Sequence, residues 1–329
     1  MPSPRRALLI LACLLGLAGL SLGAALLAGS VAVGPGELLA ILAGGEPSLA
    51  AEVVLQLRLP RALSGFACGG LLALAGALMQ VLLRNPLADP YVLGISGGAG
   101  VGALGAILLG LSGLGLDLFA FGGALGALLL VFGLAHGDGS WTQTRLLLTG
   151  VIVAAGCGAL VALMLSLAPE SQLRGMLFWL MGDLSQSLSP WPTLAALVLA
   201  LLLAMPFARE LNLLSRGAES ARTLGVAVGR LRGLVYLIAA LATAAAVTSA
   251  GAIGFIGLVV PHLVRLAIGN DQRLLLPASV LAGGTLLMAA DTLARTVIAP
   301  EQLPVGVLTA LLGVPVFLFL LSRTGGRSA

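Results

Sequence analysis

The chain has 329 residues, of which 59% are hydrophobic and only 9% are charged. Soluble domains carry roughly 25% charged residues, so this composition excludes a water-exposed globular fold and predicts a surface that mostly faces lipid. The formal net charge is +4, but the basic residues are scattered between apolar runs, which excludes a continuous nucleic-acid-binding face. All 17 of them are arginines, so the chain lacks the lysine that a P-loop ATPase requires.

Apolar runs long enough to cross a membrane recur along the whole chain. A helix needs about 20 apolar residues to cross a bilayer core about 30 Å thick, and dividing the chain at its charges, prolines and glycine clusters predicts ten such helices. They cover approximately residues 7–33, 60–83, 91–111, 118–135, 146–168, 191–207, 234–249, 252–268, 274–294 and 304–321. With a cytoplasmic amino terminus, 13 of the 17 arginines fall on the cytoplasmic side, as the positive-inside rule favours. We therefore expect an all-α polytopic membrane protein forming one transmembrane domain over residues 1–329, with both termini in the cytoplasm.

Residues 169–192, between the fifth and sixth predicted helices, are too interrupted by Gly175 and Gly182 to form a clean membrane crossing. The segment starts with a possible helix cap at Ser171. An interfacial helix here would place Phe178 at the depth of the lipid headgroups, where aromatic rings concentrate. The residues alone leave two interpretations open, a gate beside a pore or a structural belt at the interface.

Residues 208–233, after the sixth predicted helix, form the longest strongly charged segment on the predicted cytoplasmic side. Apolar residues within it are spaced to form one stripe along a helix, broken by Gly217 and ended by Gly225. The stripe consists of Leu213, Leu214, Ala218, Ala221 and Leu224. Such a helix either lies on the lipid headgroups or serves as a docking surface for a cytoplasmic partner.

Few ionisable residues lie within membrane depth, where such groups are functional candidates by default. Asp291 and Arg295 are four residues apart, a spacing that permits an ion pair along one helix. His136 and His262 are far apart in the sequence and have no clustered carboxylates, so no metal site and no cofactor is predicted.

Five motifs follow one another in a set order. They are LRLPRAL at 57–63, GALMQVLLRNPLADPYVLGISGGAGVG at 76–102, RLLLTGV at 145–151, GAIGFIGLVVPHLVRL at 251–266 and LPVGVLTALLGVPVFLFLL at 303–321. Together they resemble the FecCD-type permease subunits of binding-protein-dependent ABC importers, which take up iron-siderophores, haem or cobalamin. The resemblance covers nearly the whole chain, and the five motifs in order are far more specific than any one of them.

The resemblance implies a homodimer with the type II importer architecture of ten helices per subunit and a translocation path along the dimer axis. It implies two cytoplasmic ATP-binding subunits, an external substrate-binding protein and a location in the bacterial inner membrane. The chain itself is then a transport permease and no enzyme. The rival interpretation is a secondary transporter driven by an ion gradient, which needs intramembrane carboxylates, and Asp291 is the one plausible candidate.

The resemblance also assigns roles to residues. The helices after the sixth span couple to the ATPase, and the expected residues are Leu213, Leu214, Arg216, Glu219, Ser220, Ala221, Arg222, Leu224 and Gly225. External arginines in LRLPR and ADTLAR dock the binding protein, which assigns this role to Arg58, Arg61 and Arg295. The short helix after the fifth span resembles the family's gating helix, with Ser171, Arg174, Met176 and Phe178 as candidates.

Overall fold

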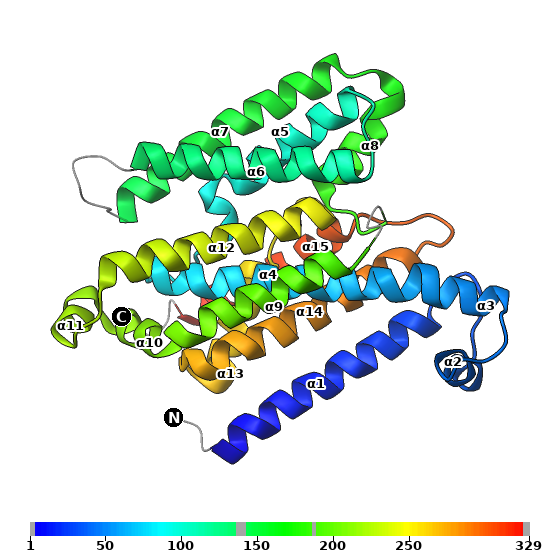
Figure 1. Ribbon diagram of the computed structural model, residues 1–329, viewed down its shortest axis with the longest axis horizontal. Coiled ribbons are helices and arrows are strands. Elements are labelled where there is room, and N and C mark those ends of the chain that lie inside the picture. The colour runs from blue at the N-terminus through cyan, green and yellow to red at the C-terminus, as the bar shows by residue number, and fades with distance from the viewer. Residues whose placement is uncertain (1–3, 136–142, 186–188, 325–329) are drawn as a thin grey trace.

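The computed structural model describes residues 4–135, 143–185 and 189–324, and every regular element among them is a helix (Figure 1). The elements are α1 (Pro4–Leu27), α2 (Pro35–Leu42), α3 (Leu49–Glu52), the π-helix η1 (Val53–Arg58), α4 (Leu59–Leu82), the 3₁₀ helix η2 (Pro90–Leu93), α5 (Ile95–Leu108), α6 (Leu114–Ala135), α7 (Gln143–Leu167), α8 (Glu170–Met181), α9 (Trp191–Ala204), the 3₁₀ helix η3 (Met205–Phe207), α10 (Ala208–Arg216), α11 (Ala218–Thr223), α12 (Val228–Ala250), α13 (Ile256–Ile268), α14 (Gln272–Thr296) and α15 (Val305–Thr324).

Seven helical stretches in the described residues are long and apolar enough to cross a membrane. They are α1, the continuous run from α3 to α4, α6, α7, the run from α9 to α10, α12 and α14. Three shorter apolar helices, α5, α13 and α15, complete the set, so the expectation of about ten membrane helices is confirmed. The helices of the bundle run mostly along one axis, with α10 and α11 at one end and α2, α3 and α8 at the other (Figure 1).

Two predicted boundaries differ from the structure for local reasons. The first helix ends at Leu27 rather than near residue 33, because Gly29 has a φ of 153° that no helix continues. The second begins at residue 49 rather than 60, because the π-helical turn η1 joins α3 to α4 without a break. The charged stretch around Arg58 therefore belongs to a long helix and not to a loop.

Helix α4 forms the centre of the core. Every residue from Ala67 to Leu82 is buried, and α4 packs against α9, α12, α13 and α14. Glycine allows two of these approaches: a Cβ on Gly76 would overlap the backbone of Gly257 in α13, and a Cβ on Gly69 would overlap the carbonyl oxygen of Gly283 in α14. Close backbone contact replaces the hydrophobic driving force that is missing between helices in lipid.

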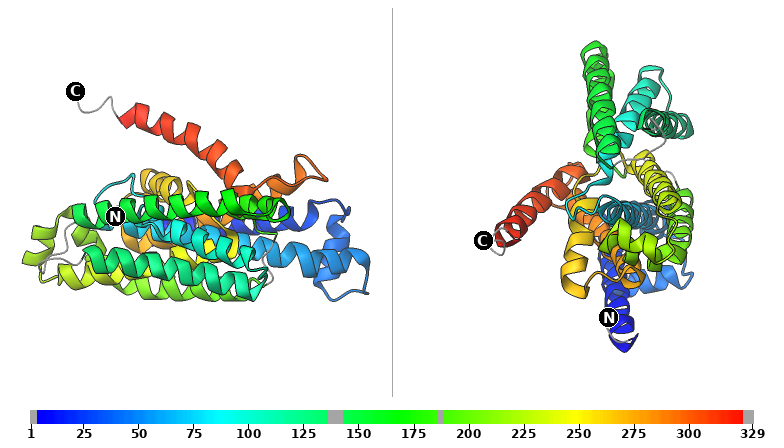
Figure 2. Two further views of the ribbon diagram at one scale, coloured as in Figure 1. Left: turned by 90° about the horizontal axis from the view of Figure 1, so that it is seen from above. Right: turned by 90° about the vertical axis from the view of Figure 1, so that its left-hand side faces the viewer.

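The remaining helices surround this core unevenly. α5 packs against α6 and α7 as a group beside α12, while α1 lies along α14 at the edge of the bundle. α15 leaves the bundle at an angle (Figure 2). Large apolar side chains on α1, α7 and α15 are exposed, among them Leu9, Ile152 and Leu311. Such continuous apolar surface requires lipid or another protein to cover it.

We predict that Gly76→Val prevents correct folding, because the added side chain meets backbone that cannot move aside. Overpacking of a close-packed core typically costs about 1–3 kcal/mol, and a backbone collision lies at the upper end of that range or beyond. The matched control is Gly126→Val on α6, where a Cβ meets no atom within 4 Å. Thermal unfolding of both variants in detergent, followed by size-exclusion chromatography, tests this. Equal midpoints for the two variants would contradict the packing account.

Candidate functional site

Arg58 lies at the α8 end of the bundle, and its side chain points inward, with only 4% of the residue exposed. Its guanidinium donates hydrogen bonds to the carbonyl oxygens of Leu26 (2.7 Å), Leu27 (3.1 Å) and Val31 (2.6 Å). Carbonyls at the end of a helix have no partner within the helix, and Arg58 supplies one. These donors hold the end of α1 inside the protein, and the binding-protein docking role expected for Arg58 stays a prediction.

The other two predicted docking arginines also make internal contacts. The half-buried Arg295 donates a hydrogen bond to the carbonyl oxygen of Ala25, at the same end of α1. Arg61 forms a bidentate pair with Asp291 at 2.8–3.1 Å and donates to the amide oxygen of Gln302 at 3.0 Å. The predicted helical pair between Asp291 and Arg295 is wrong, because Asp291 faces α4 and meets Arg61 there.

Helix α8 carries the four candidate gate residues, and they divide into buried and exposed positions. Met176 is buried and anchors the helix. Arg174 is exposed, lies over the ring of Phe178 at 5.6 Å and approaches Glu301 in the α14–α15 link at 3.8 Å. An exposed ion pair of this length contributes little to stability, so α8 is tied to that link by a weak contact that can open.

The helix cap predicted at Ser171 is wrong. α8 begins at Glu170, and Pro169 occupies the cap position without a side-chain acceptor. Ser171 instead lines a cavity of about 760 Å³ at the α8 end, between α8, the end of α5 and the α14–α15 link. Arg174 and Phe178 line the same cavity, so three of the four candidates meet at one hollow.

Three non-helical backbone segments meet below α8: its own end, the α12–α13 link at residues 251–255 and the start of α15. The backbone N–H of Asp183 donates to the carbonyl of Ala250 at 2.9 Å, and that of Val305 donates to the carbonyl of Gly182 at 3.1 Å. Broken helices at membrane depth are typical of transport proteins and persist only where protein satisfies the freed backbone groups.

Tyr91 of η2 also contacts this junction, a role that the sequence did not predict. Its hydroxyl donates to the carbonyl of Ile253 and accepts from the backbone N–H of the same residue, both at 2.9 Å. Asp89 holds the start of η2 by accepting from the backbone N–H of Tyr91 at 2.7 Å, and burial raises the pKa of Asp89. A tyrosine directly after Asp-Pro at the start of a membrane helix was the signal that could have pointed to this role.

At the opposite end, the predicted coupling segment forms two short helices, divided at the predicted break. Gly217, with a φ of 136°, separates α10 from α11. Leu214 and Ala221 are buried and hold the two helices against the bundle, whereas 65% of Leu224 is exposed.

The remaining predicted coupling residues surround Leu224 or lie at the ends of the two helices. Leu213 is half-buried, and the others are exposed: Arg216, Glu219, Ser220, Arg222 and Gly225. Glu219 and Arg222 form an exposed ion pair at 2.9 Å. The α11 end thus carries one exposed leucine together with exposed polar and charged residues.

Metal binding finds no support within the described residues, where no three histidine, cysteine, aspartate or glutamate side chains cluster. His262 is buried on α13. His136 lies outside the described residues.

We predict that Arg58→Gln destabilises the protein by about 2–4 kcal/mol, since a hydrogen bond from a charged group contributes roughly 1.5–3 kcal/mol and three carbonyls lose their donor. Arg174→Gln, which removes an exposed arginine at the same end, should change stability by less than about 0.5 kcal/mol. Denaturant unfolding in detergent measures both. A stable Arg58→Gln variant with weakened binding-protein affinity would favour the docking role instead.

Comparison with known proteins places this geometry in one family. The family model described as the FecCD transport family matches residues 9–323. The cobalamin import system permease protein BtuC of Halobacterium salinarum is 44% identical over 282 residues, covering 84% of this chain and 75% of that protein. The hemin transport system permease protein HmuU of Yersinia pestis is 45% identical over 283 residues, covering 83% and 84%.

Solved structures agree with the sequence comparisons. A metal-chelate type ABC transporter described in an inward-facing conformation superposes with a TM-score of 0.85 and 31% identity, covering 95% of this chain and 99% of that one. PsaBC from Streptococcus pneumoniae, at 19% identity and a TM-score of 0.55, shares the fold alone. The chain belongs to the FecCD transport family.

Proposed function

We propose that this permease works as a homodimer in an ABC importer of the bacterial inner membrane. Its cargo is a large metal-containing compound: cobalamin, haem or a ferric siderophore. The single observation that carries this proposal is the α10–α11 pair, which offers an exposed Leu224 among charged groups at one end of an otherwise apolar bundle.

Energy for transport comes from outside this chain. A P-loop requires a lysine, and the sequence has none. ATP hydrolysis therefore belongs to partner subunits that dock on α10 and α11, which makes the α11 end cytoplasmic. The arginine distribution supports this orientation, because Arg58, Arg61, Arg174 and Arg295 are the only four of the 17 predicted on the outside.

The proposed class of cargo follows from the names of the relatives. Relatives named for cobalamin and for hemin are almost equally identical to this chain, so identity alone favours neither. Both compounds are large and carry their own metal. A permease that passes such cargo without holding it needs a weakly binding path, in keeping with the absence of metal-ligating clusters among the described residues.

The dimer proposal rests on apolar surfaces of α7 and α15. α15 leaves the bundle at an angle (Figure 2) and exposes Leu311, Leu312 and Leu318. A second copy related by a two-fold axis covers the same surface on both subunits. The translocation path then lies between the two copies.

Helix α12 provides the route from ATP to the external gate. It begins five residues after α11 and ends at Ala250, whose carbonyl accepts from the backbone N–H of Asp183 just after α8. A displacement of α10 and α11 by the ATPase therefore reaches the junction below α8 through one continuous helix. The weak contact between Arg174 and Glu301 then opens or closes at the external mouth.

The binding protein docks at the α8 end in this proposal. Arg58 is buried and donates to the end of α1, while Arg61 keeps an exposed edge where it donates to Gln302. Rim charges mainly guide encounter and register, a role for which Arg61 and the exposed Arg174 remain.

An ion-driven secondary transporter requires a carboxylate that can bind and release a cation. Asp291, the candidate for that role, is held by two nitrogen atoms of Arg61. Both oxygen atoms of this carboxylate already accept hydrogen bonds from Arg61, which disfavours the gradient-driven alternative.

We expect Leu224→Glu to lower ATPase coupling by about tenfold or more, because a buried hot-spot residue contributes about 2 kcal/mol or more to an interface. Leu224→Met keeps the apolar contact and should retain most coupling. The measurement is ATP hydrolysis by the reconstituted complex, with and without loaded binding protein. Wild-type stimulation of the Leu224→Glu complex would refute the coupling role.

Uptake into proteoliposomes containing the full complex tests the function itself. Cobalamin, haem and a ferric siderophore are compared with and without ATP, and we expect ATP-dependent uptake of one of them. Uptake that ignores ATP and follows an imposed proton or sodium gradient would overturn the proposal. The control is Asp291→Asn, which should abolish transport only if the gradient-driven alternative holds.

A further inference from the structure

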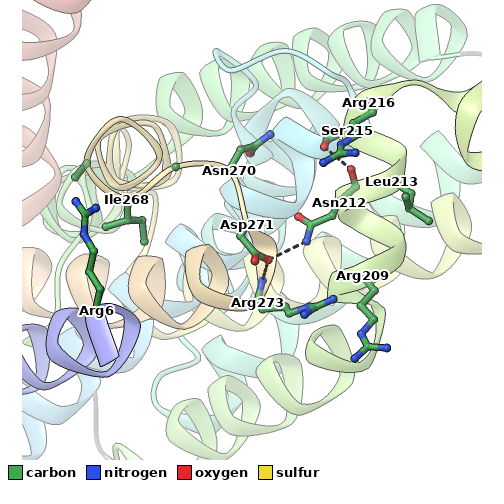
Figure 3. Close-up of a pocket in the computed structure, with 12 residues that line it drawn as sticks. Arg6, Arg209, Asn212, Leu213, Ser215, Arg216, Ile268, Asn270, Asp271 and Arg273 are labelled. Atoms are coloured by element: carbon green, nitrogen blue, oxygen red, sulfur yellow. Dashed lines mark hydrogen bonds between the residues drawn. The ribbon is translucent and has the colours of Figure 1, made fainter. Parts of the chain in front are cut away.

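A cavity of about 890 Å³ opens at the α11 end of the bundle, on the side where α1 begins (Figure 3). It lies between the start of α1, helix α10 and the turn from α13 to α14. Its lining residues are Arg6, Arg209, Asn212, Leu213, Ser215, Arg216, Ala267, Ile268, Gly269, Asn270, Asp271 and Arg273. Leu213 and Arg216 are also predicted coupling residues, whereas helix α11 contributes none of the lining.

Four arginines from three helices line this cavity, against a single acidic residue, Asp271. The carboxylate of Asp271 accepts from the side-chain amide of Asn212 at 2.8 Å and from the backbone N–H of Arg273 at 3.1 Å. It caps α14, and its carboxylate lies between Asn212 and the backbone of Arg273 (Figure 3). Within the described residues, Arg209, Arg216 and Arg273 form no ion pair. The lining has a formal charge of +3, four arginines less one aspartate, and selects for an anion.

Hydrogen bonds between α10 and the start of α14 fix one wall of the cavity. The side-chain oxygen of Asn212 accepts from the backbone N–H of Gln272 at 2.8 Å, while its amide nitrogen holds Asp271. This two-way contact fixes α10 to the start of α14. The backbone positions that carry Arg209 and Arg273, one on each helix, are therefore fixed relative to each other before any ligand arrives.

The surroundings of the cavity indicate lipid rather than water. Leu213, Ala267 and Ile268 provide apolar wall beside the arginines. Helix α1 exposes Leu8 and Leu9 within the turn that follows Arg6. Arginine next to an exposed apolar helix surface marks the depth at which headgroups meet acyl chains.

We propose that this cavity binds the phosphate of an anionic glycerophospholipid of the cytoplasmic leaflet, with its acyl chains along α1. Planar guanidinium groups match phosphate oxygens in pairs. The bound lipid joins the start of α1 to α10 and thereby steadies the helix that precedes the coupling residues. This inference goes beyond the proposed transport function and depends on the proposed orientation only for the choice of leaflet.

Native mass spectrometry of the full chain in detergent tests the proposal with two lipids of identical acyl chains, phosphatidylglycerol and phosphatidylcholine. We expect wild-type protein to prefer phosphatidylglycerol, and Arg209→Gln combined with Arg273→Gln to weaken that binding by about tenfold or more, since each arginine near an anionic surface contributes a several-fold factor. The matched control combines Arg84→Gln and Arg230→Gln, two arginines predicted on the same side but absent from the cavity. This control should keep the preference.

Three outcomes would overturn the proposal. Equal binding of the two lipids by wild-type protein would remove the anion site, and this result needs no variant to fold. An equal loss of phosphatidylglycerol binding in the two double variants would show that the preference depends only on the overall positive charge of that side. Displacement of phosphatidylglycerol by inorganic phosphate alone, or by the purified ATPase subunit, would identify a free-anion site or a protein contact instead. Transport activity enters none of these measurements, so their failure leaves the proposed function intact.

Discussion

The structure depends on one constraint, that no backbone hydrogen-bonding group can remain unsatisfied within lipid. Where α1 ends, Arg58 and Arg295 donate to its last carbonyls. Where the α12–α13 link leaves helical geometry, the hydroxyl of Tyr91 satisfies both backbone groups of Ile253. These two departures from a straight membrane helix are thus each paired with a polar group from a distant part of the sequence.

The same constraint explains why the buried helix α4 can be so rich in small residues. Glycines that meet backbone to backbone, as at Gly76 and Gly257, bring α13 against the core, and α13 begins directly after the broken link. The link is therefore held between a close-packed helix on one side and the end of α8 on the other. Closely packed backbone segments cannot deform continuously, so this junction suits an element that changes between two discrete arrangements. In our account α12 moves it, because α12 is the continuous connection from the α10–α11 pair.

Much of this architecture could be predicted from the sequence, and the failures share a cause. Ten apolar runs and the arginine distribution predict the helices because membrane crossing is a local property of the chain. The coupling segment stood out for the same local reason, and Gly217 divides it into two helices. Spacing could not reveal that Asp291 pairs with Arg61, 230 residues away, nor that Arg58 turns inward. Both depend on which helices become neighbours, and residue spacing within one segment carries no information on that.

The most direct test of the account is the distance between α8 and η1, measured in the assembled complex. Spin labels at Leu177→Cys on α8 and Leu55→Cys on η1, both exposed positions, are attached after the exposed Cys13 and the half-buried Cys157 are replaced by serine. The account predicts that the label separation shifts when a non-hydrolysable ATP analogue binds the partner subunits, and that Leu224→Glu abolishes this shift while the labelled helices stay folded. An unchanged separation in the wild-type complex, or a shift that survives Leu224→Glu, would contradict the claim that α10, α11 and α12 connect ATP to the external gate.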